Sequence, residues 1–275
     1  MDDFITRMNA RRRELFGQLA TLPAVDITGV VHASGPGGSL NEGKTWDFQL
    51  TFAAWRVGSG PIRRDELSVT RVTATQDEFD SLFHSIGPEA IVRVRARHGV
   101  DQDGKPAALV DEYLGLCDSD PELDAERERL REPVTFTDPQ LGEFRLERGL
   151  RYFTSEQLWK SDPMELSLDG ESQAEVEPAL AVARELWAQQ DHWNQRIQDA
   201  AVEALLPLKN DTWLEDGESE VTDDEFKARM LLSSVAIRPD GEFTFWYDDD
   251  GLFFGHSITV RGTLQDGPTD ANIEG

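Results

Sequence analysis

The stretch around which the chain is organised is residues 241–260, GEFTFWYDDDGLFFGHSITV. Two apolar runs, 242–247 and 253–261, alternate at the period of a β-strand on either side of one turn. The pattern predicts a closing β-hairpin whose apolar side chains complete a core: Phe243, Phe245, Phe253 and Ile258. The turn and the run after it also hold the side chains of a candidate site: Asp248, Asp249, Asp250 and His256.

The charge of the chain is strongly negative and uneven. The 275 residues are enough for two domains, and their 27 basic and 53 acidic side chains give a net charge of −26. Residues 1–118 carry −4 and residues 119–275 carry −22. Such a surface repels nucleic acid and anionic membranes and attracts basic proteins, although it also serves solubility alone. We therefore expect a basic protein partner, no nucleic acid and no membrane.

Cysteine content and the N-terminus indicate a compartment. Cys117 is the only cysteine, so no internal disulfide can form, which suits a reducing environment. The N-terminus is acidic from residue 2 and lacks the apolar core of a signal peptide. No run reaches the about 18 apolar residues of a membrane helix. These features predict a soluble, cytoplasmic protein.

The first half of the chain changes from a helical to a strand period. Residues 1–25 predict an amphipathic N-terminal helix. Residues 26–117 predict five strands, with a helix after the third that begins at the capping box Thr75-Gln76-Asp77-Glu78. The predicted strands are 26–34, 45–57, 67–72, 90–98 and 106–116. This order predicts a five-stranded barrel of the oligonucleotide/oligosaccharide-binding (OB) type.

The second half predicts a different architecture. Residues 118–133 are highly charged and predict a polar helix or a linker, which we take as the domain boundary. Residues 134–275 show strands, then helices over 175–190, over 193–206 and from the capping box at 222–225, then strands again. That order predicts an antiparallel sheet with helices packed on one face. The chain as a whole is therefore expected to be α+β, with an OB-like barrel followed by this second domain.

Residues 38–45, GSLNEGKT, match the phosphate-binding pattern G-x-x-x-x-G-K-T. That loop needs a helix beginning at its Lys-Thr pair, so that backbone N–H groups face the phosphates. Residues 46–52 alternate at the strand period instead. We therefore expect no nucleotide at this loop.

Metal and catalytic patterns are weak. The five histidines lack metal-site spacing, and no G-x-S-x-G elbow supplies a nucleophile. Consecutive aspartates are typical of a turn; they also suit calcium or magnesium, but no EF-hand pattern surrounds them. His256 is typical of a histidine that bonds the backbone. The sequence predicts no metal, no cofactor and no catalytic residue.

Three aromatic residues of the second half are candidates for binding. Trp213 lies in an acidic loop after a helix, a composition typical of an interface anchor with a charged surround. Trp246 and Phe254 belong to the predicted hairpin. The predicted binding surface unites these aromatics with the polar side chains of the hairpin: Trp213, Trp246, Asp248, Asp249, Asp250, Phe254 and His256.

The second half contains three distinctive motifs. They are Asp138-Pro139 with Leu141-Gly142-Glu143-Phe144, then LPLKNDTW at 206–213, then residues 243–258, which end in LFFGHSI. Together they resemble a bacterial family, domain of unknown function 2262, over about residues 134–275. This family usually has Phe-Trp before its Gly-His, whereas this chain has Phe253-Phe254. The resemblance implies no established activity and no catalytic residues.

Three functional hypotheses follow. The first is a non-enzymatic protein-binding module, immunity-like by analogy of composition, whose acidic second domain engages a basic bacterial partner. The alternative is a ligand- or metal-binding enzyme that uses the Asp248–Asp250 and His256 hairpin. The third, ranked last because of the acidic charge, is a barrel that binds single-stranded nucleic acid through Arg93, Arg95 and Arg97.

Overall fold

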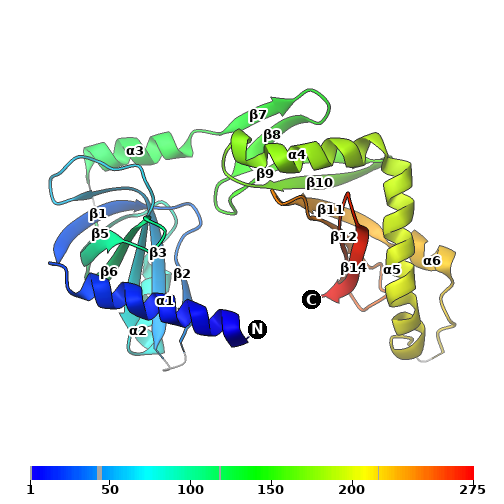
Figure 1. Ribbon diagram of the computed structural model, residues 1–275, viewed down its shortest axis with the longest axis horizontal. Coiled ribbons are helices and arrows are strands. Elements are labelled where there is room, and N and C mark those ends of the chain that lie inside the picture. The colour runs from blue at the N-terminus through cyan, green and yellow to red at the C-terminus, as the bar shows by residue number, and fades with distance from the viewer. Residues whose placement is uncertain (1, 42–44, 118, 216) are drawn as a thin grey trace. The chain divides into compact units, whose positions relative to one another are not determined.

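The computed structural model describes residues 2–41, 45–117, 119–215 and 217–275, with side chains from Arg7 onward. The chain divides into two compact units, residues up to Glu132 and residues from Pro133 (Figure 1). Six helices and two sheets make up the described residues, so the class is α+β. No described helix is both long and apolar enough to span a membrane.

The first unit is built on a ring of five strands. Its elements are α1 (Asp2–Ala20), β1 (Val25–Val31), β2 (Gly37–Leu40), β3 (Trp46–Val57), β4 (Leu67–Thr73), α2 (Gln76–Ser85), β5 (Ile91–Val100), β6 (Pro106–Leu116) and α3 (Pro121–Arg131). The ring runs β1–β3–β4–β6–β5 and returns to β1, with β4 and β6 parallel and the other neighbours antiparallel. Closure removes the free edges that an open sheet exposes. The predicted ring of five, OB-like in its connections, is therefore present.

Strand β2 is a sixth strand that the sequence did not predict. It pairs antiparallel with β3, placing Gly37 opposite Gln49 and Leu40 opposite Trp46. Residues 42–44 of the phosphate-loop lookalike lie outside the described residues. Trp46 begins β3, so a strand follows the lookalike where a phosphate loop needs a helix.

Two contacts attach the first helices to the ring. Thr75 caps α2, accepting a hydrogen bond from the Glu78 backbone N–H at 3.2 Å, but the Glu78 side chain accepts from the Ala74 N–H at 3.3 Å, so the predicted capping box is only half formed. Arg12 of α1 forms a bidentate ion pair with Asp47 of β3, and Asp47 is 1% exposed. A buried carboxylate needs such a partner, so this pair fixes α1 on the ring.

The segment predicted as a charged linker forms helix α3, which belongs to the first unit. Asp120 caps it by accepting from the Leu123 N–H at 3.2 Å, and Leu123 is fully buried. Glu126 accepts from Arg64 at 3.0 Å and from Arg129 at 2.9 Å. The Arg64 hydrogen bond, aided by Arg129, lowers the pKa of Glu126 to about 2. The charged residues therefore serve the attachment of this helix.

The second unit contains one eight-stranded sheet. Its elements are β7 (Thr135–Asp138), β8 (Gly142–Glu147), β9 (Tyr152–Trp159), β10 (Asp162–Asp169), α4 (Gln173–Ala188), α5 (Gln190–Thr212), α6 (Asp223–Arg229), β11 (Leu231–Ile237), β12 (Phe243–Asp248), β13 (Ser257–Thr263) and β14 (Gly267–Glu274). The strands lie in the order β14–β13–β12–β11–β10–β9–β8–β7. The predicted antiparallel sheet is wrong at one place, because β10 and β11 are parallel, with Leu166 opposite Val235. The three helices form the long connection that parallel neighbours require.

The predicted hairpin supplies the centre of the core. Phe245 of β12 pairs with Val235 on one side and Val260 on the other, and all three are 0% exposed. Their shared face packs in one cluster with buried residues of α4 and α5, such as Ala183 and Ile197. Residues directly opposite in a sheet point to the same face, so the alternation in the sequence decided which side chains are inside.

Candidate functional site

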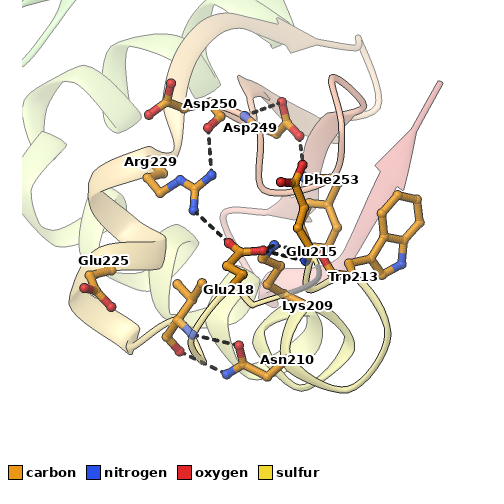
Figure 2. A network of polar contacts seen from close by, with 12 residues as sticks. Lys209, Asn210, Trp213, Glu215, Glu218, Glu225, Arg229, Asp249, Asp250 and Phe253 are labelled. Atoms are coloured by element: carbon orange, nitrogen blue, oxygen red, sulfur yellow. Dashed lines mark hydrogen bonds and ion pairs between the residues drawn. The ribbon is translucent and has the colours of Figure 1, made fainter.

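The loop between β12 and β13 is built on one buried aspartate. Asp249 is 5% exposed, and its carboxylate accepts hydrogen bonds from the backbone N–H groups of Gly251 (3.2 Å), Phe253 (2.5 Å) and Gly255 (3.1 Å). Figure 2 shows Asp249 beside Phe253. An aspartate side chain is short enough to accept from the backbone just ahead of it. Both carboxylate oxygens are therefore engaged in holding the loop.

This loop presents Phe254 to solvent. Phe254 has a φ of 58°, in the left-handed region that non-glycine residues rarely adopt. Phe254 is 55% exposed, while its neighbour Phe253 is fully buried. Backbone strain of this kind costs about 1–3 kcal/mol and is concentrated at sites that bind ligands or partners. The Asp249 hydrogen bonds hold the strained segment in place.

Trp213, at the C-terminal end of α5, covers the same loop. Its ring lies edge-on to Phe253 at 5.6 Å and to His256 at 5.4 Å, and tilted against Phe254 at 5.4 Å between centroids. His256 Nδ1 donates to the Phe253 carbonyl at 2.7 Å, the backbone-bonding role expected from the sequence. We call these four residues, Trp213, Phe253, Phe254 and His256, the aromatic cluster.

A buried lysine, Lys209, holds the backbone of the aromatic cluster at Trp213 (Figure 2). The Lys209 side chain is 0% exposed, and its Nζ donates to the Trp213 carbonyl and to Glu218 Oε2, each at 2.8 Å. Glu218 also accepts from the Glu215 N–H at 2.9 Å. The Lys209 hydrogen bond, followed by that of Glu215, holds the pKa of Glu218 below its ordinary value. A buried ammonium needs these partners, so the pair fixes the chain on both sides of Trp213.

Further contacts tie the acidic loop to its surroundings. The Asn210 side chain donates to the Val221 carbonyl at 3.0 Å and accepts from the Val221 N–H at 2.9 Å. Thr222 begins α6 in the predicted capping box. Arg229 at the end of α6 donates to the Asp250 carbonyl at 2.9 Å, which connects this helix to the β12–β13 loop. These hydrogen bonds thus connect the loop after α5, helix α6 and the β12–β13 loop, which holds part of the aromatic cluster.

Trp246 lies apart from the other predicted binding residues. It pairs with Ser234 and Thr259, so it points to the sheet face opposite the buried Phe245. Asp248 follows two residues later on the same outer face and is exposed. The predicted binding surface therefore divides: Trp213, Phe254 and His256 come together, and Trp246 does not join them.

The three consecutive aspartates do not converge on one point. Asp249 is buried with both oxygens engaged by backbone N–H groups, whereas Asp248 and Asp250 are exposed. Asp250 has a φ of 41°, which belongs to the turn itself. A hard cation needs several oxygen ligands around one centre, and this arrangement does not provide it. The aspartates serve the turn.

The sequence reading missed Lys209 and its partner Glu218. A signal was available, because Lys209 continues a row at intervals of four residues, Ile197, Ala201 and Leu205, all buried on one face of α5. A lysine in such a row must either reach solvent or find a buried partner. Glu218 gave no comparable signal, since it is one of many acidic residues in its loop.

The arginines considered for nucleic-acid binding are partly engaged in the first unit. Arg95 pairs with Asp26 at 2.9 Å, and Arg97 pairs with Asp111 at 3.1 Å. Arg97 also donates to the Ala20 carbonyl at 2.9 Å. Two of these three guanidinium groups therefore already have acidic partners in the fold.

Comparison with known families places both units. Residues 138–273 match the model of a family described as an uncharacterized protein conserved in bacteria (DUF2262). The C-terminal unit matches this family. In this unit the three motifs that carry the resemblance form the turn between β7 and β8, the end of α5 and the β12–β13 hairpin. A second family model, a domain of unknown function (DUF7021), matches residues 12–130, which the sequence reading had not related to any family.

No curated protein matches the chain. Among solved structures, the small single-stranded DNA-binding protein from Streptomyces coelicolor is similar over 36% of this chain and 94% of its own, at 13% identity and a TM-score of 0.25. The wild-type single-stranded DNA-binding protein from Thermus aquaticus is similar over 53% of this chain and 73% of its own, at 13% identity and a TM-score of 0.25. At these TM-scores neither likeness supports a functional argument.

Proposed function

We propose that the C-terminal unit is a non-enzymatic protein-binding module that takes a basic partner, with the aromatic cluster at the centre of the contact. The observation that carries the proposal is Phe254, which is 55% exposed on a left-handed backbone and lies against Trp213. Aromatic anchors at the centre of a contact commonly supply most of its binding energy. An immunity-like protein that blocks a basic bacterial protein is one member of this class.

The charge around the cluster supports a basic partner. Residues 133–275 hold 11 basic and 30 acidic side chains. Exposed carboxylates come both before and after the cluster residues along the chain: Asp211, Glu215, Asp248 and Asp250. An apolar centre with a charged surround is the usual arrangement of a binding interface, and the negative surround would steer a basic protein toward it. The single cysteine favours a cytoplasmic setting for this encounter.

The exposed phenylalanine provides the test. Wild-type protein, Phe254→Ala and the control Leu158→Ala are immobilised and offered a lysate of the native host. Leu158 is 58% exposed on β9, so its truncation removes a similar apolar side chain from another part of the same unit. We expect wild type and Leu158→Ala to retain one basic protein that Phe254→Ala releases, with a loss of about 2 kcal/mol in binding, typical of a hot spot.

The purified partner then allows the kinetics to be measured. Association with wild type should be faster at low salt, because exposed charges accelerate encounter and salt screens them. Phe254→Ala should change dissociation more than association. If no basic protein depends on Phe254, or if association is indifferent to salt, the proposal is wrong.

A further inference from the structure

A cavity of about 400 Å³ opens in the C-terminal unit, away from the aromatic cluster. Its wall is built from the turn between β9 and β10, the N-terminal half of α5, the end of α6 and the strands β11 and β12. Its polar and aromatic lining comprises Trp159, Lys160, Asp162, Asn194, Gln198, Lys227 and Tyr247. None of these side chains takes part in the contact proposed above.

A chain of side-chain hydrogen bonds fixes which atoms the wall can offer. Trp159 Nε1 can only donate, and it donates to Asn194 Oδ1 at 3.0 Å. This sets the orientation of the Asn194 amide, whose Nδ2 donates to Gln198 Oε1 at 3.1 Å. The chain therefore ends on the Gln198 NH₂ group. Gln198 Nε2 is therefore the donor that this series of hydrogen bonds leaves over.

Tyr247 adds a second donor. It is 1% exposed, and its hydroxyl has no hydrogen-bond partner among the described residues. A buried hydroxyl without a partner is unfavourable, and native proteins retain few of them. Burial raises the pKa of Tyr247, so the phenol keeps its proton at neutral pH. The hydroxyl is thus a protonated donor without a partner in the described part of the chain, in a residue that lines the cavity.

Two lysines supply positive charge to the same wall. Lys160 pairs with Asp191 at 3.0 Å, and Lys227 pairs with Asp199. Both carboxylates are well exposed, at 89% and 50% of their side chains, so water can replace either lysine as their partner at small cost. Asp162 is the one acidic residue among the described lining residues, which is unusual in so acidic a unit. The cavity is therefore richer in cations than its surroundings.

The remaining wall is apolar. Met230, Leu231 and Leu232, where α6 passes into β11, line the cavity beside the Trp159 ring. Small-molecule sites combine such apolar walls with a few polar groups that fix orientation. Here the fixed polar groups are donors and cations, which select an acceptor-rich, negatively charged group.

From this arrangement we propose that the cavity binds a small organic anion, with a carboxylate or phosphate held by Lys160, Lys227 and the Tyr247 hydroxyl. The apolar part of the molecule packs against Met230, Leu231 and Leu232. The Gln198 NH₂ group donates to a further acceptor on the ligand. Carboxylates and phosphates share this chemistry, and the test separates them.

Three probes of similar size test the site in the full chain: phenylacetate, phenyl phosphate and the neutral 2-phenylethanol. Binding is followed through the indole N–H signal of Trp159 in ¹H–¹⁵N spectra, which the Trp159→Phe variant identifies. We expect the anions to shift this signal with a Kd in about the millimolar range, reasonable for so few atoms. The neutral probe should bind about tenfold more weakly, because it lacks charge-assisted hydrogen bonds.

Variants assign the anion to its ligands. Lys227→Gln should weaken the preferred anion about tenfold, and Tyr247→Phe should weaken it severalfold without disturbing the fold. Arg238→Gln removes the same charge from an exposed position outside the cavity and should leave binding unchanged. Tighter binding of phenyl phosphate would assign a phosphate, and the reverse a carboxylate. If the neutral probe binds as tightly as the anions, if Lys227→Gln behaves like Arg238→Gln, or if no probe moves the signal, the proposal is overturned.

Discussion

The three consecutive aspartates offer a controlled test of how the β12–β13 loop is held. Asp248, Asp249 and Asp250 can each be changed to Asn, which removes one negative charge and leaves the shape of the side chain. Only the middle carboxylate is buried and bonded to the backbone N–H groups of the loop. We expect Asp249→Asn to destabilise the C-terminal unit and its two neighbours to have little effect.

The expected magnitude follows from the hydrogen bonds. In Asp249→Asn the amide oxygen can still accept from Phe253 and Gly255, but the NH₂ group then faces the Gly251 N–H, so one bond is lost. The two that remain lose their ionised acceptor. Removal of one partner of a buried bond costs about 1–3 kcal/mol, which sets the expected loss for Asp249→Asn. Asp249→Ala removes all three bonds and should cost about 2–4 kcal/mol, whereas exposed changes stay within about 0.5 kcal/mol.

Denaturant unfolding followed by tryptophan fluorescence measures these values. Five of the seven tryptophans lie in residues 133–275, so the signal reports mainly on the C-terminal unit. The Asp249 variants should also lose Phe254-dependent partner binding, because the loop that presents the ring would relax. Equal unfolding free energies for the Asn variants at 248, 249 and 250 would contradict the assigned role of the buried carboxylate.

Three further predictions concern other parts of the chain. Tyr247→Phe should raise the unfolding free energy of the C-terminal unit by about 1 kcal/mol, because it removes a buried hydroxyl without a partner; destabilisation in denaturant titration would count against this reading. Glu126 has a pKa of about 2 against an ordinary 4.5, so it stabilises the folded state above pH 4.5, and that contribution is lost as the pH falls from 4.5 toward 2. Glu126→Gln should flatten the acid unfolding curve of the first unit in this window, and an unchanged curve would show that the Arg64 pair is not responsible. Gly29→Ala should cost about 1–3 kcal/mol, since a Cβ there would lie 2.4 Å from a phenylalanine ring, while Gly17→Ala, with open space, should be neutral or stabilising; similar thermal midpoints for the two would refute the packing argument.

Local patterns predicted the elements, and long-range pairing limited the prediction of the sheet. The helix caps at Thr75 and Thr222 are present, and the box at Thr222 is complete, because each needs only residues within about one helical turn. The parallel pairing of β10 and β11 was missed. Alternation in a strand predicts which side chains are buried, but it does not determine whether a neighbour is parallel or antiparallel. The three intervening helices were in the prediction and were the available clue.

The sequence predicted most residues of the candidate site but not all of the contacts between them. The sequence identified Trp213, Phe254 and His256, whose rings lie together although 40 residues of chain separate Trp213 from Phe254 and 42 separate it from His256. It also grouped Trp246 with them, because proximity in sequence does not reveal the sheet face to which a side chain points. Lys209 left a signal in its helical row, but its partner Glu218 did not, because an ion pair closed across a loop has no fixed spacing in the sequence. Such partners become visible only when the fold brings them together.

The three motifs that carry the family resemblance have one physical role in common in this chain: their polar side chains hold loops. Asp138 accepts from the backbone N–H groups of Gln140 and Leu141, as Asp249 does in its own loop, and Lys209 and Asn210 bind the loop after α5. A match to these motifs therefore predicts the shape of the loops and says little about chemistry. Phe254 is different, because the core does not need its exposed ring. If these loops exist to present a surface, the identity of the partner should depend on this position, and exchanging Phe254 for Trp should alter affinity while the unfolding free energy stays nearly constant.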